Sequence, residues 1–89
     1  MAARMQSGLD ALSLAQIESA VQRLYDLGRI ELIHRGMMPE AEVFACRYQG
    51  RRFNLKYDLA YGAQLQAVAA FSHDELDAIA ASLVAAADQ

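Results

Sequence analysis

The sequence predicts an α+β domain: an N-terminal helix, a three- or four-stranded antiparallel β-meander and a C-terminal helix, with both helices packed on one face of the sheet. Residues 14–27 and 73–87 repeat apolar side chains at helical spacing. Residues 51–59 alternate apolar and polar side chains, which is typical of a half-buried strand. Gly50 separates two strand-like runs, where a tight hairpin turn needs positive φ. Because 89 residues leave room for one core, residues 1–89 are expected to form a single domain.

The first helix has clear start and stop signals. Residues 1–11 carry little periodic pattern, so we expect them to fray or to form one loose turn. Ser13 can cap the helix, and Gln16, three residues on, completes a capping box. Gly28 suits the left-handed residue that follows a helix. The expected helix therefore runs from about Leu14 to Leu27.

Three strands are expected to follow. The first covers residues 29–35, with Leu32 and His34 on one face and Ile33 and Arg35 on the other. Residues 36–40, which include Pro39, should form a turn, because proline interrupts sheet pairing. The second strand, residues 42–49, is apolar on both faces and is expected to be central or covered on both sides. After a turn at residues 49–51, the third strand covers residues 51–59.

The last third of the chain leaves one element open. Residues 63–70 alternate like a fourth strand, but their alanine and glutamine content also suits a helix. We favour the strand, because Phe71 and Ser72 open a new helix directly afterwards. Ser72 and Glu75 form the second capping-box signal, which predicts a helix over residues 73–87.

Composition limits the class of protein. A single cysteine, Cys46, excludes an internal disulfide framework and a cysteine-based zinc site. No apolar run has the length of a membrane span, and the first residues lack the pattern of a signal peptide, so we expect a cytoplasmic protein. The hydrophobic fraction of 55% is high for so short a chain, and a surplus of this kind is typical of a homodimer interface.

Candidate catalytic residues are few. Cys46 lies in the middle of a predicted strand without a glycine-rich elbow, as a small buried side chain would. His73 stands in a capping sequence that explains it without a ligand, and His34 has no partner motif. We therefore expect no enzyme, no cofactor and no metal. A metal-dependent enzyme using His34, His73 and nearby carboxylates is the alternative.

The most uneven feature is charge. The net charge is −3, yet residues 47–56 contain Arg47, Arg51, Arg52 and Lys56 and no acid, while residues 57–89 contain no Lys or Arg. Such a basic hairpin can dock on an acidic partner surface. The expected partner-binding residues are the four hairpin cations Arg47, Arg51, Arg52 and Lys56, together with Arg35 and Ile33 of the first strand.

Size and charge together suggest a non-enzymatic protein-binding module. By analogy alone, it would be a small regulator or inhibitor of the immunity-protein, phage-inhibitor or antiactivator type. The alternative is a nucleic-acid-binding regulator that uses the same hairpin, with its aromatic residues for base stacking. Strand alternation opposes that alternative, because it puts Tyr48, Phe53 and Tyr57 on the core face.

Overall fold

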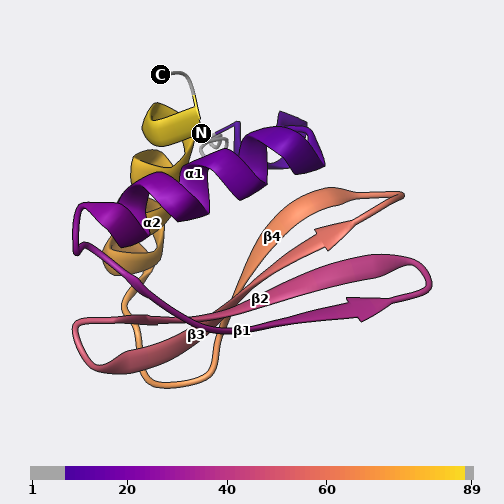
Figure 1. The fold of residues 1–89 in the computed structure, drawn as a ribbon. Helices are drawn as coiled ribbons and strands as arrows, with labels where there is room; N and C mark the ends of the chain where they lie inside the picture. Colours follow the sequence, from indigo (N-terminus) through magenta and orange to yellow (C-terminus); the bar gives the residue numbers. More distant parts are fainter. Residues whose placement is uncertain (1–7, 88–89) are drawn as a thin grey trace.

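The computed structural model describes residues 8–87 and confirms the α+β class. Its elements, in chain order, are η2 (Leu9–Ala11), α1 (Leu14–Asp26), β1 (Glu31–Met38), β2 (Ala41–Tyr48), β3 (Arg51–Asp58), β4 (Gly62–Ala67) and α2 (His73–Ala87). The strands form one antiparallel sheet in the order β1-β2-β3-β4. Both helices lie over the same face of this sheet, and the other face carries no helix (Figure 1).

Both helices begin at the predicted capping boxes. The Ser13 hydroxyl accepts from the Gln16 N–H at 3.2 Å, and the Gln16 side chain accepts from the Ser13 N–H at 2.8 Å. Ser72 and Glu75 repeat this exchange at 3.1 Å and 2.9 Å. These bonds satisfy amide groups that have no partner inside the helix. Among residues 8–87, no helix is long and apolar enough to cross a membrane.

The segment that could form either a strand or a helix, residues 63–70, contributes the fourth strand of the sheet, as favoured. In β4, Leu65 lies opposite Leu55 and Gln64 lies opposite Lys56, so the apolar members share the helix-facing side. The β2–β3 turn consists of Gln49 and Gly50, whose φ angles are 51° and 79°. Both angles are positive, as the two-residue turn that suits strand twist requires.

The first strand differs from the prediction. It extends through Gly36 to Met38, and the turn is confined to Pro39 and Glu40, because pairing with β2 outweighs the turn preference of glycine. The register also shifts between Leu32 and His34, which marks a β-bulge at Ile33. One extra residue reverses the alternation beyond it. His34 pairs with Ala45 of the uncovered face, and Arg35 pairs with Phe44 of the helix-facing side.

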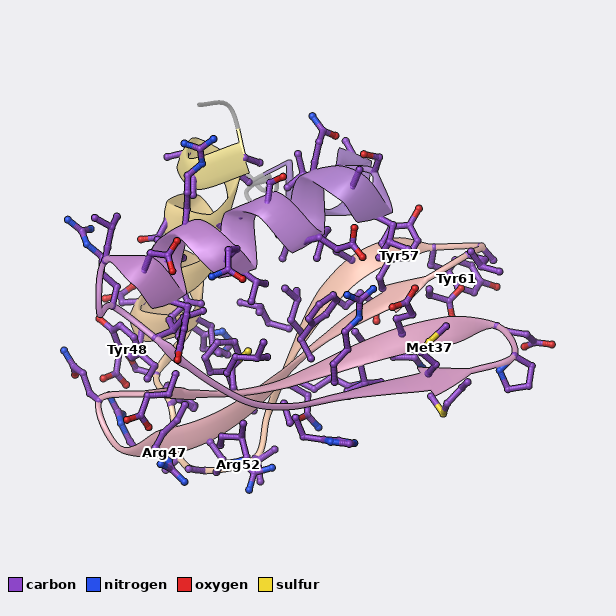
Figure 2. The ribbon with its side chains drawn as sticks, viewed as in Figure 1. Met37, Arg47, Tyr48, Arg52, Tyr57 and Tyr61 are labelled. Carbon is purple, nitrogen blue, oxygen red and sulfur yellow. The ribbon has the colours of Figure 1, made fainter. Side chains whose placement is uncertain are left out.

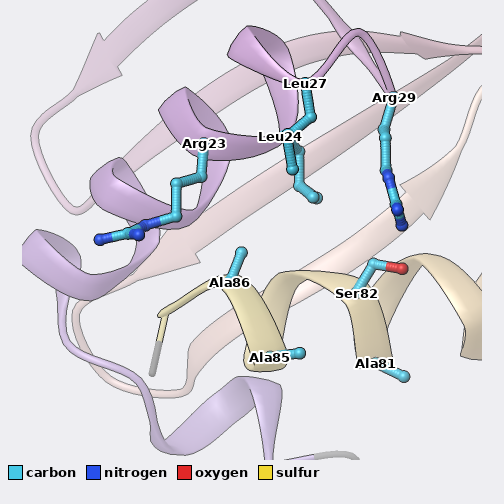
Figure 3. A pocket seen from close by; sticks show the side chains of 8 residues that line it. All are labelled: Arg23, Leu24, Leu27, Arg29, Ala81, Ser82, Ala85 and Ala86. Carbon is cyan, nitrogen blue, oxygen red and sulfur yellow. The ribbon is translucent and has the colours of Figure 1, made fainter. Parts of the chain in front are cut away.

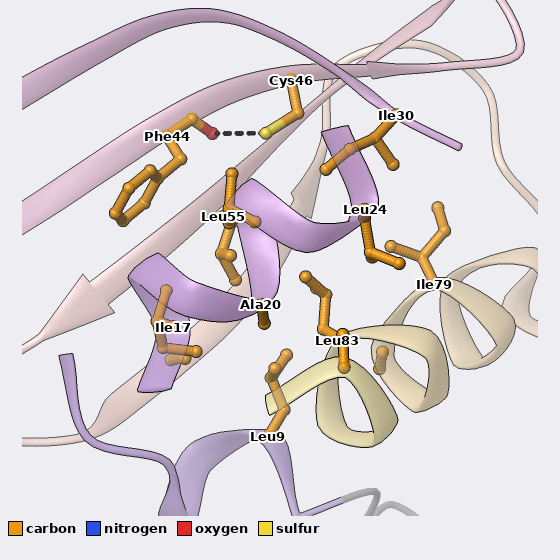
Figure 4. Close-up of a cluster of buried hydrophobic side chains, with 14 of the residues drawn as sticks. Leu9, Ile17, Ala20, Leu24, Ile30, Phe44, Cys46, Leu55, Ile79 and Leu83 are labelled. Atoms are coloured by element: carbon orange, nitrogen blue, oxygen red, sulfur yellow. Dashed lines mark hydrogen bonds between the residues drawn. The ribbon is translucent and has the colours of Figure 1, made fainter. Parts of the chain in front are cut away.

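The core lies between the helix layer and the sheet (Figure 4). Its largest fully buried side chains are Phe44, Phe53, Ile17, Leu55, Leu83, Val21 and Cys46. Leu9 is only 5% exposed and belongs to this core, so of the two alternatives expected for the start of the chain, η2 is the single turn and not a frayed end. Residues 1–7, to which the same expectation applied, lie outside the described residues.

Candidate functional site

The face of the sheet opposite the helices, called the open face below, carries three of the six predicted binding residues, Arg47, Arg52 and Lys56. Strand register assigns its polar members, which are Glu31, His34, Arg47, Arg52, Asn54, Lys56, Asp58, Gln64 and Gln66. Arg47 and Arg52 point away from the helices (Figure 2). No described helix covers them, so their charged ends are available to another molecule.

One row across the open face concentrates positive charge. Glu31 lies opposite Arg47, and Arg47 lies opposite Arg52 on the next strand. The Arg47 guanidinium donates to the Glu31 carboxylate at 2.8 Å. Arg52 forms neither a hydrogen bond nor an ion pair through its side chain with another described residue. The Arg52 charge in this row is therefore not neutralised by a carboxylate. It also faces Arg47, and like charges directly opposite each other on neighbouring strands are destabilising.

Lys56 adds a second cation to the same face. It lies between Val43 of β2 and Gln64 of β4, neither of which is acidic. Its ammonium forms no ion pair with a described residue. Lys56 and Arg52 are two of the predicted binding residues, and neither forms an ion pair with a described residue, although Asp58 follows Lys56 on the same face.

Arg35 lies on the helix-facing side, contrary to the predicted face. Its guanidinium contacts Glu42 on β2, with Nε donating at 2.8 Å, and contacts Glu18 on α1 at 2.5 Å. It also lies over the Phe44 ring, 4.8 Å from the centroid. These contacts raise the pKa of Arg35, chiefly through the hydrogen bond to Glu42. The β-bulge at Ile33 causes the difference, and Arg35 joins β1 to the first helix.

Arg51 also lies on the helix-facing side, because it pairs with Tyr48. Its guanidinium donates to both oxygens of Glu75, at 3.0 Å and 2.6 Å. It donates to the Ala70 carbonyl at 3.1 Å and lies 4.6 Å from the centroid of the Phe71 ring. Arg51 therefore connects the β2–β3 hairpin to the start of α2, and its charge is compensated.

Ile33 stands at the bulge on the outer edge of the sheet, where β1 has no neighbouring strand. Its side chain is exposed, as are Leu32 and both Met37 and Met38 on the same strand. The prediction that Ile33 is an exposed apolar residue is confirmed. Its part in binding a partner stays a prediction.

The hairpin aromatics lie on the opposite side from the free cations. Phe53 is fully buried in the core, and Tyr48 and Tyr57 pack against it. Strand register assigns no Phe or Tyr among residues 8–87 to the open face. A surface that stacks bases needs aromatic rings beside its cations, and the described part of this face does not combine them.

The candidate catalytic residues are separated in the structure. Cys46 is fully buried, its thiol donates to the Phe44 carbonyl at 3.6 Å, and burial raises its pKa to about 12. His34 lies on β1, whereas His73 is the first residue of α2. Within residues 8–87, no three His, Cys, Asp or Glu side chains are grouped closely enough to hold a metal ion.

Sequence reasoning missed an apolar patch at the far end of the sheet. The turns after β1 and β3 meet there, since the Leu59 N–H donates to the Glu40 carbonyl at 3.1 Å. Met37 is 77% exposed and Tyr61 is 74% exposed, and the side chain of Leu59 is exposed to a similar extent. Figure 2 shows Met37, Tyr57 and Tyr61 at this end. The available signal was the apolar residues that flank both turns.

The comparisons with known proteins add no function to this geometry. No family model, no curated protein and no solved structure matched the chain. The features of the molecule that bear on its function are the open face and the charges that it presents.

Proposed function

We propose that this protein is a non-enzymatic binding module that docks the open face of its sheet on an acidic surface of another protein. The observation that carries the proposal is Arg52, which lies opposite Arg47 and has no acidic partner among the described residues. Such a placement costs stability in the isolated domain. An acidic partner would remove that cost and gain charge-assisted hydrogen bonds.

Lys56 and Arg47 complete the proposed contact surface. Arg47 already holds Glu31 in an exposed ion pair, which contributes little to stability and can be exchanged for a partner carboxylate. Arginine can bind a carboxylate through two parallel hydrogen bonds, which fixes orientation as well as charge. In this role the protein acts as a small regulator or inhibitor whose effect comes from occupying its partner.

The proposal narrows the original set of binding residues. Arg35 and Arg51 are bound to carboxylates within the domain, so their expected role is to hold the sheet against the helices. Changing Arg51 would disturb the hairpin and would not isolate a binding effect. Arg52 is the better test, because a glutamate there would face Arg47 and relieve the like-charge contact.

The experiment is affinity capture from a lysate of the source organism, with bound protein and nucleic acid both analysed at low and moderate salt. Three forms are compared: wild type, Arg52→Glu, and a control with Ala15→Glu and Ser19→Glu on the exposed side of α1. The control matches the charge change of Arg52→Glu. We expect the wild type and the control to retain the same protein at moderate salt and Arg52→Glu to lose it.

Two results would contradict the proposal. Equal retention by Arg52→Glu would place binding elsewhere on the molecule. Retention of nucleic acid alone, and only at low salt, would favour the nucleic-acid alternative, since phosphate contacts weaken steeply with salt. Light scattering on the wild type tests the homodimer, which stays a prediction.

A further inference from the structure

Two adjoining cavities open where α1 ends, on the helix-facing side of the sheet. One, of 340 Å³, follows the groove between α1 and α2 (Figure 3). The other, of 290 Å³, lies between the end of α1, the end of β2 and α2. Both are lined by Leu24, Arg29 and Ser82, so they meet at these residues. Together they reach the size range of small-molecule sites, roughly 300–1,000 Å³.

The inner surface of the smaller cavity is apolar. Leu24, Ile30 and Ile79 form its floor and are themselves buried in the domain, so the accessible apolar surface comes from Leu27 and the alanines of the larger cavity. In the larger cavity, Ala81 and Ala85 of α2 are exposed, and their short side chains leave the groove unfilled. This surface would accept a hydrocarbon chain, which gains free energy by leaving water.

Arg29 and Ser82 are the polar groups where the two cavities meet, and Arg23 adds a second guanidinium to the lining of the larger cavity. Arg29 is exposed, and its side chain extends toward Ser82 across the groove (Figure 3). The Arg29 guanidinium forms no hydrogen bond or ion pair with another described residue. Tyr48 and Gln49 add polar side chains to the smaller cavity. A charged donor therefore stands beside an apolar surface, which is the pattern of an amphipathic ligand site.

The sign of the ligand charge follows from the neighbouring groups. Among the described residues that line the two cavities, none is Asp or Glu. The end of α1 would repel an anion through its carbonyl oxygens, but two of these already accept hydrogen bonds. The Arg29 N–H donates to Leu24 at 2.9 Å, and the Gly28 N–H donates to Tyr25 at 3.0 Å. The groove is therefore complementary to an anion.

We propose that this groove binds a small amphipathic carboxylate, meaning an unbranched apolar chain that ends in a carboxylate. Arg29 binds the carboxylate through its paired N–H groups, and the Ser82 hydroxyl donates a further hydrogen bond. The chain lies against Leu27, Ala81 and Ala85, the exposed apolar side chains of the larger cavity. This site is distinct from the open face and does not depend on the docking function.

The test is a titration of the full chain with octanoate, in which binding is monitored through the backbone amide resonances in ¹H–¹⁵N NMR spectra. We expect saturable shifts at Gly28, Arg29 and Ser82. Arg29→Gln should weaken binding roughly tenfold or more, as expected for loss of a charge-assisted contact. Ala15→Glu, which makes the same charge change at the exposed start of α1, away from the groove, should bind as the wild type does.

Two further measurements distinguish binding at this site from non-specific binding of the ligand to apolar surface. Octan-1-ol, which has the same chain and no charge, should bind more weakly than octanoate. Ser82→Leu should fill the junction of the cavities and remove binding while its spectrum stays that of the folded chain. The proposal is wrong if octanoate gives no saturable shift, if Arg29→Gln binds as tightly as the wild type, or if octan-1-ol binds equally well.

Discussion

The guanidinium of Arg51 and the carboxylate of Glu75 form two hydrogen bonds, of 3.0 Å and 2.6 Å, which join the β2–β3 hairpin to the first turn of α2. The same carboxylate accepts from the Ser72 N–H at 2.9 Å. Glu75 therefore caps its helix and anchors the hairpin at once. Neither residue can be changed without affecting both elements.

The pH dependence of folding should report on Glu75. Hydrogen bonds from Arg51, and then from the Ser72 N–H, lower its pKa from 4.5 to about 2. Because the folded pKa is below the unfolded one, the stabilisation is fully present above about pH 4.5 and is lost as the pH falls through about 2. Glu75→Gln keeps the capping geometry without the charge. The difference in free energy of unfolding between the wild type and Glu75→Gln should therefore shrink as the pH falls through that range. Urea denaturation at several pH values measures this difference.

A double variant controls this measurement. Arg51→Gln combined with Glu75→Gln should cost less than the sum of the single changes, because each single change already removes the ion pair. If Glu75→Gln loses as much free energy of unfolding at acidic pH as near neutral pH, the charge of Glu75 does not stabilise the fold as proposed.

Leu9 should contribute to stability despite its position near the start of the chain. It is 5% exposed and packs in the core, whereas Leu27 is 67% exposed. Leu9→Ala should lower the free energy of unfolding by about 2–5 kcal/mol, the range for buried leucine. Leu27→Ala should change it by less than about 0.5 kcal/mol. Urea denaturation of both variants makes the comparison, and equal effects would mean that η2 is not part of the folded core.

Two glycines with the same backbone conformation should respond differently to alanine. Gly50 and Gly62 have φ angles of +79° and +80°, which cost an L-residue roughly 1–2 kcal/mol. A Cβ at Gly50 would meet open space, but one at Gly62 would lie 2.2 Å from the Asp10 carbonyl oxygen. Gly62→Ala should therefore lower the thermal midpoint clearly more than Gly50→Ala. Equal shifts would show that η2 does not approach β4 this closely.

Cys46 should be unreactive in the folded protein. Burial raises its pKa to about 12, so only about one thiol in ten thousand is ionised at about pH 8. Alkylation by iodoacetamide, followed by mass spectrometry, should be slow in buffer and fast in urea. A Ser19→Cys variant on a Cys46→Ala background provides an exposed control that should react quickly in both. Rapid modification of native Cys46 would contradict its burial.

The site was only partly predictable from the sequence. Alternation within β3 correctly predicted that Arg52 and Lys56 share a face opposite to Phe53 and Leu55. Alternation predicted the wrong face for Arg35, because the bulge at Ile33 inserts one residue into β1 and no local sequence pattern indicates that bulge. A list of basic residues also cannot distinguish Arg51, which binds Glu75, from Arg52, which has no acidic partner among the described residues.

The sequence by itself determined the elements and their order, because capping boxes, apolar periodicity and turn glycines act over a few neighbouring residues. Ser13 and Ser72 start their helices through contacts three residues away. Tertiary structure alone decided which charges are compensated, since Glu18 and Arg35, or Arg51 and Glu75, meet only after the sheet and helices pack. Charge pairing acts through space between segments far apart in the chain. The cations that remain available for binding are therefore a property of the fold.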